Sequence, residues 1–467
     1  MDFFSTFGQL EGSLFWLFVM CMIAICFFEF VNGFHDTANA VATVIYTKSL
    51  KPQIAVVLSG VLNFLGVIFS NYLFGMGVAV GIIKLLPLGE MMNIGIYENV
   101  AIVGSVVIAA IIWNLGTWYF GIPCSSSHTL VGSLLGAGLG YQLIHKGDGV
   151  NWSKAGDIGM SLLLSPAFGF TMAIILMYMA QRVLKKKDLF KPNNPGAPPF
   201  KTRALLIGTC SLVSFFHGSN DGQKGLGLMM IILMTFMPLQ FSLNEKFGDT
   251  QTIEHLDNIQ KILTNYKTSS PLEKEFNNTI SNIDILKTDI YNNNDSTAKQ
   301  KFEIRKRIQV ITKSLEIIVK DPEFLPNKSV RDEIKSEIKF MKSYTDWAPN
   351  WAIMLIALSI GIGTMIGWKR IVVTIGEKIG KSHLSYGQGA VSELVAASTI
   401  GLSTTLGLPV STTHVLSSAI AGSMVAKGGV KNLQKNTIKS IAIAWLLTLP
   451  VSIILALSFF LLFRLFI

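Results

Sequence analysis

Long stretches of this 467-residue chain carry no charged side chain. Most of these runs reach the roughly 20 helical residues that a hydrocarbon core about 30 Å thick requires, and together they predict about ten to twelve membrane-crossing or re-entrant segments. The longest run would extend about 69 Å as one helix, so it must fold back on itself. The pattern predicts an all-α polytopic membrane protein. The runs free of Asp, Glu, Lys and Arg are 52–83, 99–144, 158–181, 204–220, 225–244, 347–368, 394–426 and 440–463.

Between two of these runs lies a polar block, residues 243–346. It contains 17 basic and 17 acidic residues and is therefore neutral. Apolar residues recur in it at steps of four and three, as on one face of a helix, and Ser329 followed by Asp332 resembles a capping box. We expect a helical insert, which either senses a ligand or partner or simply packs on itself. The apolar stripe consists of Ile304, Ile308, Ile311, Leu315 and Ile318.

Composition agrees with membrane insertion. Half of the residues are hydrophobic and 15% are charged, whereas soluble domains carry about a quarter charged residues. The net charge of +10 comes from basic residues at the edges of apolar runs, so a nucleic-acid partner is not expected. The N-terminus has no basic residue before its apolar stretch, unlike a cleaved signal peptide. No metal-ligand spacing or structural disulfide is expected of Cys21, Cys26, Cys124 and Cys210.

Basic residues in short loops predict the orientation. The segment 182–203 carries seven basic residues against one acidic residue, which is typical of a cytoplasmic loop. Threading the chain outward from it places the N-terminus and the polar insert on the outer face. We expect a first membrane repeat over 1–182 and a basic cytoplasmic linker over 183–203. The second membrane repeat consists of 204–242, where a break is possible, and 347–467. The insert, 243–346, separates these two parts.

Two pairs of polar motifs indicate an internal duplication. Asn32–Asn39 aligns with His217–Lys224 on a shared Gly-x-x-Asp, and Gly121–His128 aligns with Gly407–His414 on Gly-x-Pro-x-Ser-(Ser/Thr)-(Ser/Thr)-His. The two motifs lie much farther apart in the second half, and the excess is close to the length of the insert. Because the loop after the first motif is predicted inside and the insert outside, the two copies are predicted to be inverted in the membrane, as in many secondary transporters.

The second motif predicts a half-helix in each copy. Pro123 and Pro409 cannot continue a helix, so the hydroxyl residues that follow would occupy the first turn of a new one. Unpaired backbone N–H groups and the positive end of the helix dipole make such a terminus an anion site. A lone motif of this kind is more often a kink with back-bonded hydroxyls, but its repetition favours function. The residues concerned are Ser125, Ser126, Ser127, Ser411, Thr412 and Thr413.

Two carboxylates complement these anion sites. Asp36 and Asp221 lie inside apolar segments, where an ionised group is costly unless it is paired, protonated or bound to a cation. His128 and His414 could carry a proton. Glu29 lies seven residues before Asp36, and it is equally a proton relay or a partner of a nearby donor. Anion donors beside two carboxylates predict a site for an anion together with a cation or proton.

The residues then resemble a known family. Gly33–Thr43, Gly218–Asp221 and Pro409–His414 are similar to the inorganic phosphate transporter (PiT) family, above all to its bacterial low-affinity, proton-coupled members. His35 stands where the wider family usually has Asn, so sodium ligands are not carried over. The resemblance implies uptake of phosphate, as a neutral divalent metal–phosphate complex, with H⁺ across the bacterial inner membrane. No permanently bound cofactor is implied, Mg²⁺ or a similar cation would travel with phosphate, and a homo-oligomer such as a dimer is compatible.

The candidate site residues follow from the motifs and the resemblance together. Asp36 and Asp221 are also the candidate metal ligands. For the substrate the candidates are Asn39, Ser125, Ser126, Ser127, Asn220, Gln223, Lys224, Ser411, Thr412 and Thr413, and for proton or cation coupling they are Asp36, Asp221, His35, His128, His414 and Glu29.

Three alternatives to this function stay open. The first is sodium-coupled phosphate transport. The second is transport of sulfate or another oxyanion, because N–H and hydroxyl donors do not distinguish it strongly from phosphate. A protonated phosphate, however, can donate to Asp36 or Asp221, and sulfate cannot. The third is an intramembrane hydrolase, which is disfavoured because Ser127 and His128 are adjacent in one turn and an enzyme does not need two copies.

Overall fold

The computed structural model describes residues 8, 10–91, 94–184, 187–191, 198–244, 246–266, 272–291 and 297–467. Regular structure among these residues is helical, apart from one isolated bridge between Gly380 and Leu433. The chain divides into two compact units. The membrane unit comprises Met1–Pro87, Tyr97–Ile232 and Pro349–Ile467, and the polar unit comprises Leu88–Ile96 and Leu233–Ala348. The predicted all-α fold is therefore confirmed for the described part of the chain.

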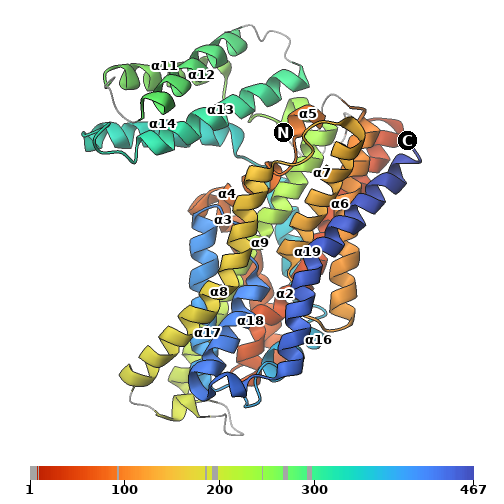
Figure 1. Ribbon diagram of the computed structural model, residues 1–467, viewed down its shortest axis with the longest axis vertical. Helices are drawn as coiled ribbons and strands as arrows, with labels where there is room; N and C mark the ends of the chain where they lie inside the picture. The colour runs from red at the N-terminus through yellow and green to blue at the C-terminus, as the bar shows by residue number, and fades with distance from the viewer. Residues whose placement is uncertain are drawn as a thin grey trace. The chain divides into compact units, whose positions relative to one another are not determined.

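The helices of the membrane unit follow the apolar runs (Figure 1). Five described helices are long and apolar enough to cross a membrane by themselves, namely α2, α3, α6, α8 and α19. This number is below the ten to twelve segments expected, because the remaining helices are short or carry the polar motifs. The elements are α2 (Gly12–Tyr46), α3 (Pro52–Phe74), α4 (Gly77–Ile83), α6 (Ile96–Tyr119), α7 (Ser126–His145), α8 (Trp152–Val183), η1 (Lys187–Phe190), α9 (Phe200–Phe236), α15 (Asn350–Thr364), α16 (Lys369–Glu377), α17 (Tyr386–Thr405), α18 (Thr412–Gly428), η2 (Val430–Asn432) and α19 (Lys435–Arg464).

The two longest charge-free runs are interrupted at the predicted places. One is divided between α6 and α7, and the other between α17 and α18. Each break contains a glycine in the left-handed region, Gly121 at φ 66° and Gly407 at φ 68°, where a side chain would be strained. In contrast, the break considered possible within 204–242 does not occur before Phe236, since α9 is continuous through its polar motif.

Glycines bring helices into backbone contact at equivalent positions of the two halves. A Cβ atom on Gly33 of α2 would lie 2.3 Å from the carbonyl oxygen of Ile360 in α15. A Cβ atom on Gly218 of α9 would lie 2.2 Å from the carbonyl oxygen of Asn63 in α3. No larger residue fits at either position. Gly33 and Gly218 are the aligned glycines that precede Asp36 and Asp221 by three residues, so the same close approach occurs about one turn before each carboxylate.

The half-helices pack in the same reciprocal way. α7 packs against α19, and α18 packs against α8, so each half-helix lies on the last helix of the other half. A Cβ atom on Gly136 would lie 2.2 Å from the Ile453 carbonyl oxygen, and one on Gly422 would lie 2.3 Å from that of Phe170. Gly136 and Gly422 lie at the same distance beyond Pro123 and Pro409. Each half therefore holds the half-helix of the other.

The polar unit has its own hydrophobic core, formed mainly by α11 (Asp249–Thr264), α12 (Glu273–Tyr291), α13 (Ala298–Ile318) and α14 (Lys328–Thr345). Two short helices, α5 (Leu88–Met91) and α10 (Pro238–Phe241), also belong to this unit. The predicted apolar stripe of α13 is buried in this core, which confirms its helical pattern. The predicted capping box is wrong: Asn327 caps α14 by accepting from the Ser329 N–H at 2.9 Å. An Asn side chain two residues upstream is as good a cap as Ser.

The close approach of α9 to α3 can be tested on one helix. Gly218→Ala should destabilise the protein by about 1–3 kcal/mol, because the new methyl group overlaps the Asn63 carbonyl. Gly208→Ala is the matched control, since a Cβ atom there meets nothing within 4 Å, and Ala is the better helix former by about 1 kcal/mol. Thermal unfolding of the purified variants in detergent measures the change in stability caused by each substitution. Equal melting temperatures for the two variants would contradict the packing described.

Candidate functional site

Two buried carboxylates lie near the middle of α2 and α9, and one serine hydroxyl reaches both. Asp36 and Asp221 are at most 1% exposed. Ser126, the first residue of α7, donates to Asp36 Oδ2 at 3.0 Å, and its Oγ lies 3.5 Å from Asp221 Oδ2. The two aspartates, 185 positions apart in the chain, therefore face one small space at the start of a half-helix.

Both half-helices begin where the sequence predicts. Ser125 caps α7 by accepting from the His128 N–H at 3.2 Å, and Ser411 caps α18 by accepting from the His414 N–H at 3.1 Å. α18 begins at Thr412, and all of these residues are buried. Thr413 donates its hydroxyl to Asp36 Oδ1 at 2.8 Å. The first turns of both half-helices thus lie beside the carboxylates, where the hydroxyls of Ser126 and Thr413 donate to Asp36.

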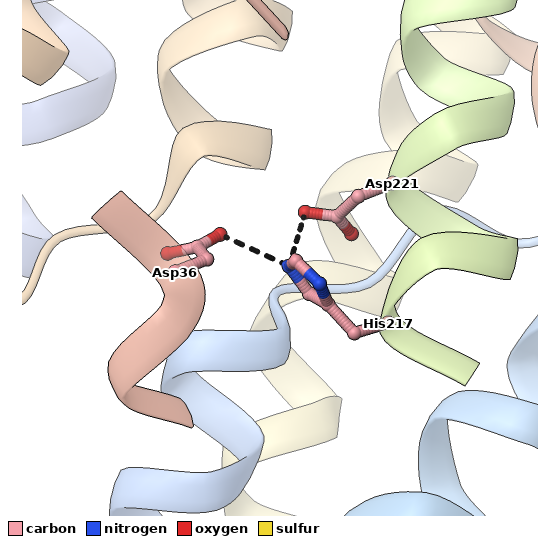
Figure 2. A group of neighbouring side chains, drawn as sticks. All are labelled: Asp36, His217 and Asp221. Carbon is pink, nitrogen blue, oxygen red and sulfur yellow. Dashed lines mark ion pairs between the residues drawn. The ribbon is translucent and has the colours of Figure 1, made fainter. Parts of the chain in front are cut away.

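His217 lies between the two carboxylates (Figure 2). Its Nε2 is 3.4 Å from Asp221 Oδ2 and 3.7 Å from Asp36 Oδ2, and it has no hydrogen-bond partner among the described residues. Its Nδ1 lies 2.9 Å from Asn63 Oδ1, an acceptor, so Nδ1 carries the proton. Nε2 therefore points either a second proton or a lone pair at the two carboxylates. One ligand atom from each of Asp36, His217 and Asp221 can lie within 4.8 Å of the others, as a metal ion requires.

His217 is absent from the candidates chosen from the sequence. It belongs to the second copy of the first motif, but its counterpart in the first copy is Asn32, and the alignment drew attention to His35 and Asn220. The available signal was the spacing of four residues between His217 and Asp221, which places both on one face of α9.

His35 pairs with Asp36 from the other side. Its Nδ1 lies 3.1 Å from Asp36 Oδ1, and its Nε2 lies 3.3 Å from the Thr117 hydroxyl oxygen. The Thr117 hydroxyl has the carbonyl of Trp113 as an acceptor at 3.0 Å, so its oxygen is free to accept from the imidazole. Both ring nitrogens of His35 thus face acceptors, an arrangement that suits a doubly protonated ring.

His128 and His414 lie against each other, with ring centroids 4.6 Å apart, and His414 stacks on Trp445 at 3.9 Å. Both are buried. His128 Nδ1 lies 2.8 Å from Ser125 Oγ, and not against the adjacent Ser127. The structure therefore brings together the two motif histidines, one from each half-helix.

Asn39 and Asn220, from the two copies of the first motif, both bond to residues around the start of α18. Asn39 donates to the Thr413 hydroxyl at 2.9 Å. Asn220 donates to the Thr404 hydroxyl at 3.0 Å and accepts from the Val410 N–H at 3.3 Å. Asn39 therefore contacts the first turn of α18, and Asn220 contacts α17 and the segment that leads into α18.

Gln223 lies outside the cluster of the two aspartates. It donates to the Ser70 hydroxyl at 2.7 Å and to the Gly75 carbonyl at 2.9 Å, and it accepts from the backbone N–H groups of Val78 and Ala79 at 3.0 and 3.4 Å. Its amide is saturated by the start of α4. In this structure Gln223 joins α3 to the start of α4, and its contact with substrate stays a prediction.

Lys224 is buried beside the site. Its ammonium group donates to Asp221 Oδ1 at 2.6 Å, to Ser127 Oγ at 2.5 Å and to the Val410 carbonyl at 2.8 Å. Ser127 in turn donates to the same carbonyl at 2.8 Å. All three ammonium hydrogens are thus directed at protein oxygens.

Glu29 is fully buried and lies about two helical turns before Asp36 on α2. Its Oε2 accepts from the Asn32 amide at 3.2 Å, and its Oε1 has no hydrogen-bond partner among the described residues. This leaves both earlier interpretations of Glu29 open, since a single amide partner does not compensate a buried charge.

The profile of the phosphate transporter family matches residues 32–456, which include both copies of both motifs. The chain belongs to the phosphate transporter family.

Within this family the chain is similar to bacterial proteins over almost its whole length. It is 38% identical to the low-affinity inorganic phosphate transporter PitA of Escherichia coli K12, over 94% of this chain and 95% of that one. It is also 38% identical to the low-affinity inorganic phosphate transporter of Buchnera aphidicola subsp. Acyrthosiphon pisum, over 97% of each chain. A solved structure named "The sodium-dependent phosphate transporter" shares the fold, with a TM-score of 0.56 and 21% identity over 97% of this chain and 100% of that chain.

Membership of the phosphate transporter family excludes the enzyme interpretation. The relatives are named as transporters, and the His128–Ser125 contact is part of a helix cap. Bacterial relatives and long apolar helices together identify a multi-pass bacterial membrane protein.

This family member has one further buried carboxylate that the sequence did not single out. Glu393 of α17 is fully buried and accepts from the hydroxyl groups of Thr43 in α2 and Thr209 in α9. It lies at the edge of a charge-free run, where it was counted only as the end of that run. Its burial depends on helices from both halves, which the sequence pattern does not place together.

Proposed function

We propose that this chain imports inorganic phosphate across a bacterial inner membrane by H⁺ symport, with phosphate entering as a neutral complex with a divalent cation. The observation that carries this proposal is the position of Ser126, whose hydroxyl reaches both carboxylates at the start of a half-helix. Anion donors and cation ligands therefore lie within one hydrogen bond of each other. Family membership and the names of the full-length relatives support phosphate as the anion.

Phosphate would be held by backbone N–H groups of the first turns of α7 and α18. Helix N-termini favour anions through these unpaired donors and through the helix dipole. The hydroxyls of Ser126 and Thr413 already point at Asp36 and can turn toward phosphate oxygens. A protonated phosphate can in addition donate to a carboxylate, which favours it over sulfate.

The divalent cation would be bound by Asp36, His217 and Asp221. Carboxylate oxygens are the ligands that Mg²⁺ prefers, and an imidazole nitrogen also suits transition metals. Only one oxygen of Asp221 would bind the cation. Its Oδ1 accepts from Lys224, and its Oδ2 faces His217. A cation there would neutralise the charge that the phosphate brings into the membrane.

Protons would be carried by the imidazoles that face Asp36 and Asp221. The groups in contact with these carboxylates are His35 and His217, together with the ammonium of Lys224. Imidazoles can gain and lose a proton near neutral pH. With both imidazoles neutral, the two aspartates and Lys224 leave one negative charge uncompensated. One transported proton on His35 or His217 would neutralise it.

Alternating access would come from an inverted repeat. The equivalent glycine contacts of α2 with α15 and of α9 with α3, and the reciprocal packing of α7 and α18, support two copies of one layout. In this arrangement one copy rocks against the other around a fixed midplane site. The first copy would be 1–182, the linker 183–203, and the second copy 204–242 and 347–467, with 243–346 as an insert on the outer face.

Uptake of labelled phosphate into proteoliposomes tests the proposed function. With Mg²⁺ present, an acidic exterior should stimulate uptake, and a sodium gradient should not. Asp36→Asn and Asp221→Asn should each abolish uptake while leaving insertion intact, because Asn keeps the size and removes the charge. Asp148→Asn, in an exposed loop, is the control. Normal uptake by both site variants would remove the carboxylates from the mechanism, and uptake driven by sodium would favour the sodium-coupled alternative.

The half-helix account makes a separate prediction at Ser126. Ser126→Ala should weaken phosphate binding by only about 1–2 kcal/mol, or roughly tenfold, because backbone N–H groups remain. Ser126→Leu should be far worse, because its side chain blocks approach to those groups. Equilibrium binding of labelled phosphate to the two purified variants measures the loss of affinity caused by each substitution. Equal losses for Ala and Leu would indicate a site made mainly of hydroxyls.

The proposed orientation can be tested by thiol labelling. Ser329 of α14 and Asp188 of η1 are exposed. In a background without other accessible thiols, Ser329→Cys should react with a membrane-impermeant reagent added to whole spheroplasts. Asp188→Cys should react only after the membrane is opened. The reverse labelling pattern would show that the insert lies on the cytoplasmic side and the linker on the outer side.

A further inference from the structure

Lys224 has the surroundings of a bound metal cation rather than of a substrate contact. Its side chain is 3% exposed, and its Nζ lies 2.5–2.8 Å from three oxygens. They are a carboxylate oxygen of Asp221, the hydroxyl of Ser127 and the main-chain carbonyl of Val410. The carbonyl belongs to the unwound segment that precedes α18.

This set of oxygens is typical of a cation site in a transporter. Unwound backbone carbonyls beside broken helices are where secondary transporters bind coupling cations, and carboxylate, hydroxyl and carbonyl oxygens are the ligands of hard cations. An ammonium is a compact point charge with three donors, so it can replace such an ion on three oxygens. It differs in being covalently attached.

In the first repeat, an uncharged residue, Asn39, stands at the position that Lys224 has in the second repeat. Asn39 aligns with Lys224, as Thr413 aligns with Ser127. The Asn39 amide donates to the Thr413 hydroxyl at 2.9 Å, which is the counterpart of the Lys224–Ser127 bond. The Asn39 carbonyl oxygen has no partner among the described residues, although it is buried. One repeat thus offers a neutral oxygen where the other holds a permanent cation.

We propose that the ammonium group of Lys224 occupies a monovalent cation site of the second repeat and so replaces a coupling sodium ion with a fixed charge. The proposal deepens the proposed function, since it identifies the residue that makes transport independent of sodium at this site. Lys224 is then a determinant of ion selectivity and not a ligand of phosphate. Its positive charge stays with Asp221 through the transport cycle.

Replacing Lys224 by the residue of the other repeat should restore the ion site. In Lys224→Asn, Asp221 Oδ1 loses its counter-charge, and a buried carboxylate without one is unfavourable. The hydroxyl of Ser127, the carbonyl of Val410 and the new amide oxygen would remain around it. A sodium ion should bind there, whereas Lys224→Met keeps the length of the side chain but fills the space with apolar atoms.

Two measurements on purified protein test the proposal, each in NaCl and in choline chloride of equal concentration. The first is the melting temperature without phosphate, and the second is binding of labelled phosphate at fixed Mg²⁺. Lys224→Asn should melt higher and bind phosphate on the order of tenfold more tightly in NaCl, within the usual range of coupling between two ligands. Wild type, Lys224→Met and Lys146→Asn should show no difference. Lys146 is an exposed helix C-cap at φ 53°, which Asn tolerates.

A monodisperse Lys224→Asn protein that responds equally to NaCl and choline would overturn the proposal, as would a wild-type protein that melts higher in NaCl. If Lys224→Asn does not fold, Lys224→Gln, with a longer amide, provides the same test. The melting measurement contains no phosphate. A protein that fails to transport phosphate therefore leaves this test of Lys224 intact, and the two failures can be told apart.

Discussion

The rest of the structure depends on the burial of two carboxylates in a membrane. An ionised Asp in a hydrocarbon environment is costly unless it is compensated, and here Asp36 and Asp221 face the same space. Their partners are drawn from four helices: the hydroxyls of Ser126 and Thr413, the imidazoles of His35 and His217, and the ammonium of Lys224. The Ser126 hydroxyl bridges the two carboxylates at the start of α7, where the proposed cation and anion would bind together.

Close helix packing is the condition for this arrangement. Gly33 and Gly218, about one turn before the two aspartates, let their helices touch the backbones of α15 and α3. Half-helices at membrane depth also need their free ends satisfied. Ser125 and Ser411 provide the caps, and the last helix of the opposite half supports each half-helix.

Local signals in the sequence were sufficient for the fold class and for the half-helices. Proline, left-handed glycine and a capping serine act within a few residues, so their effect on the chain at Pro123 and Pro409 can be predicted without tertiary information. The duplication also pointed correctly to the motifs that contain the two aspartates. What the pattern could not provide was the direction of each polar side chain. Gln223 and His217 lie on the same helix six residues apart, yet one is bound to α4 and the other lies between the carboxylates. Glu393 was missed for the same reason, because its partners come from two distant helices.

In the proposed mechanism, one site between the two half-helices holds phosphate and a divalent cation side by side. A structure of the purified protein with phosphate and Mn²⁺, with the metal located by its anomalous scattering, tests this most directly. The account predicts a manganese peak among Asp36, His217 and Asp221, and phosphate against the N–H groups that open α7 and α18. Phosphate bound elsewhere, or manganese bound away from these three residues, would contradict it.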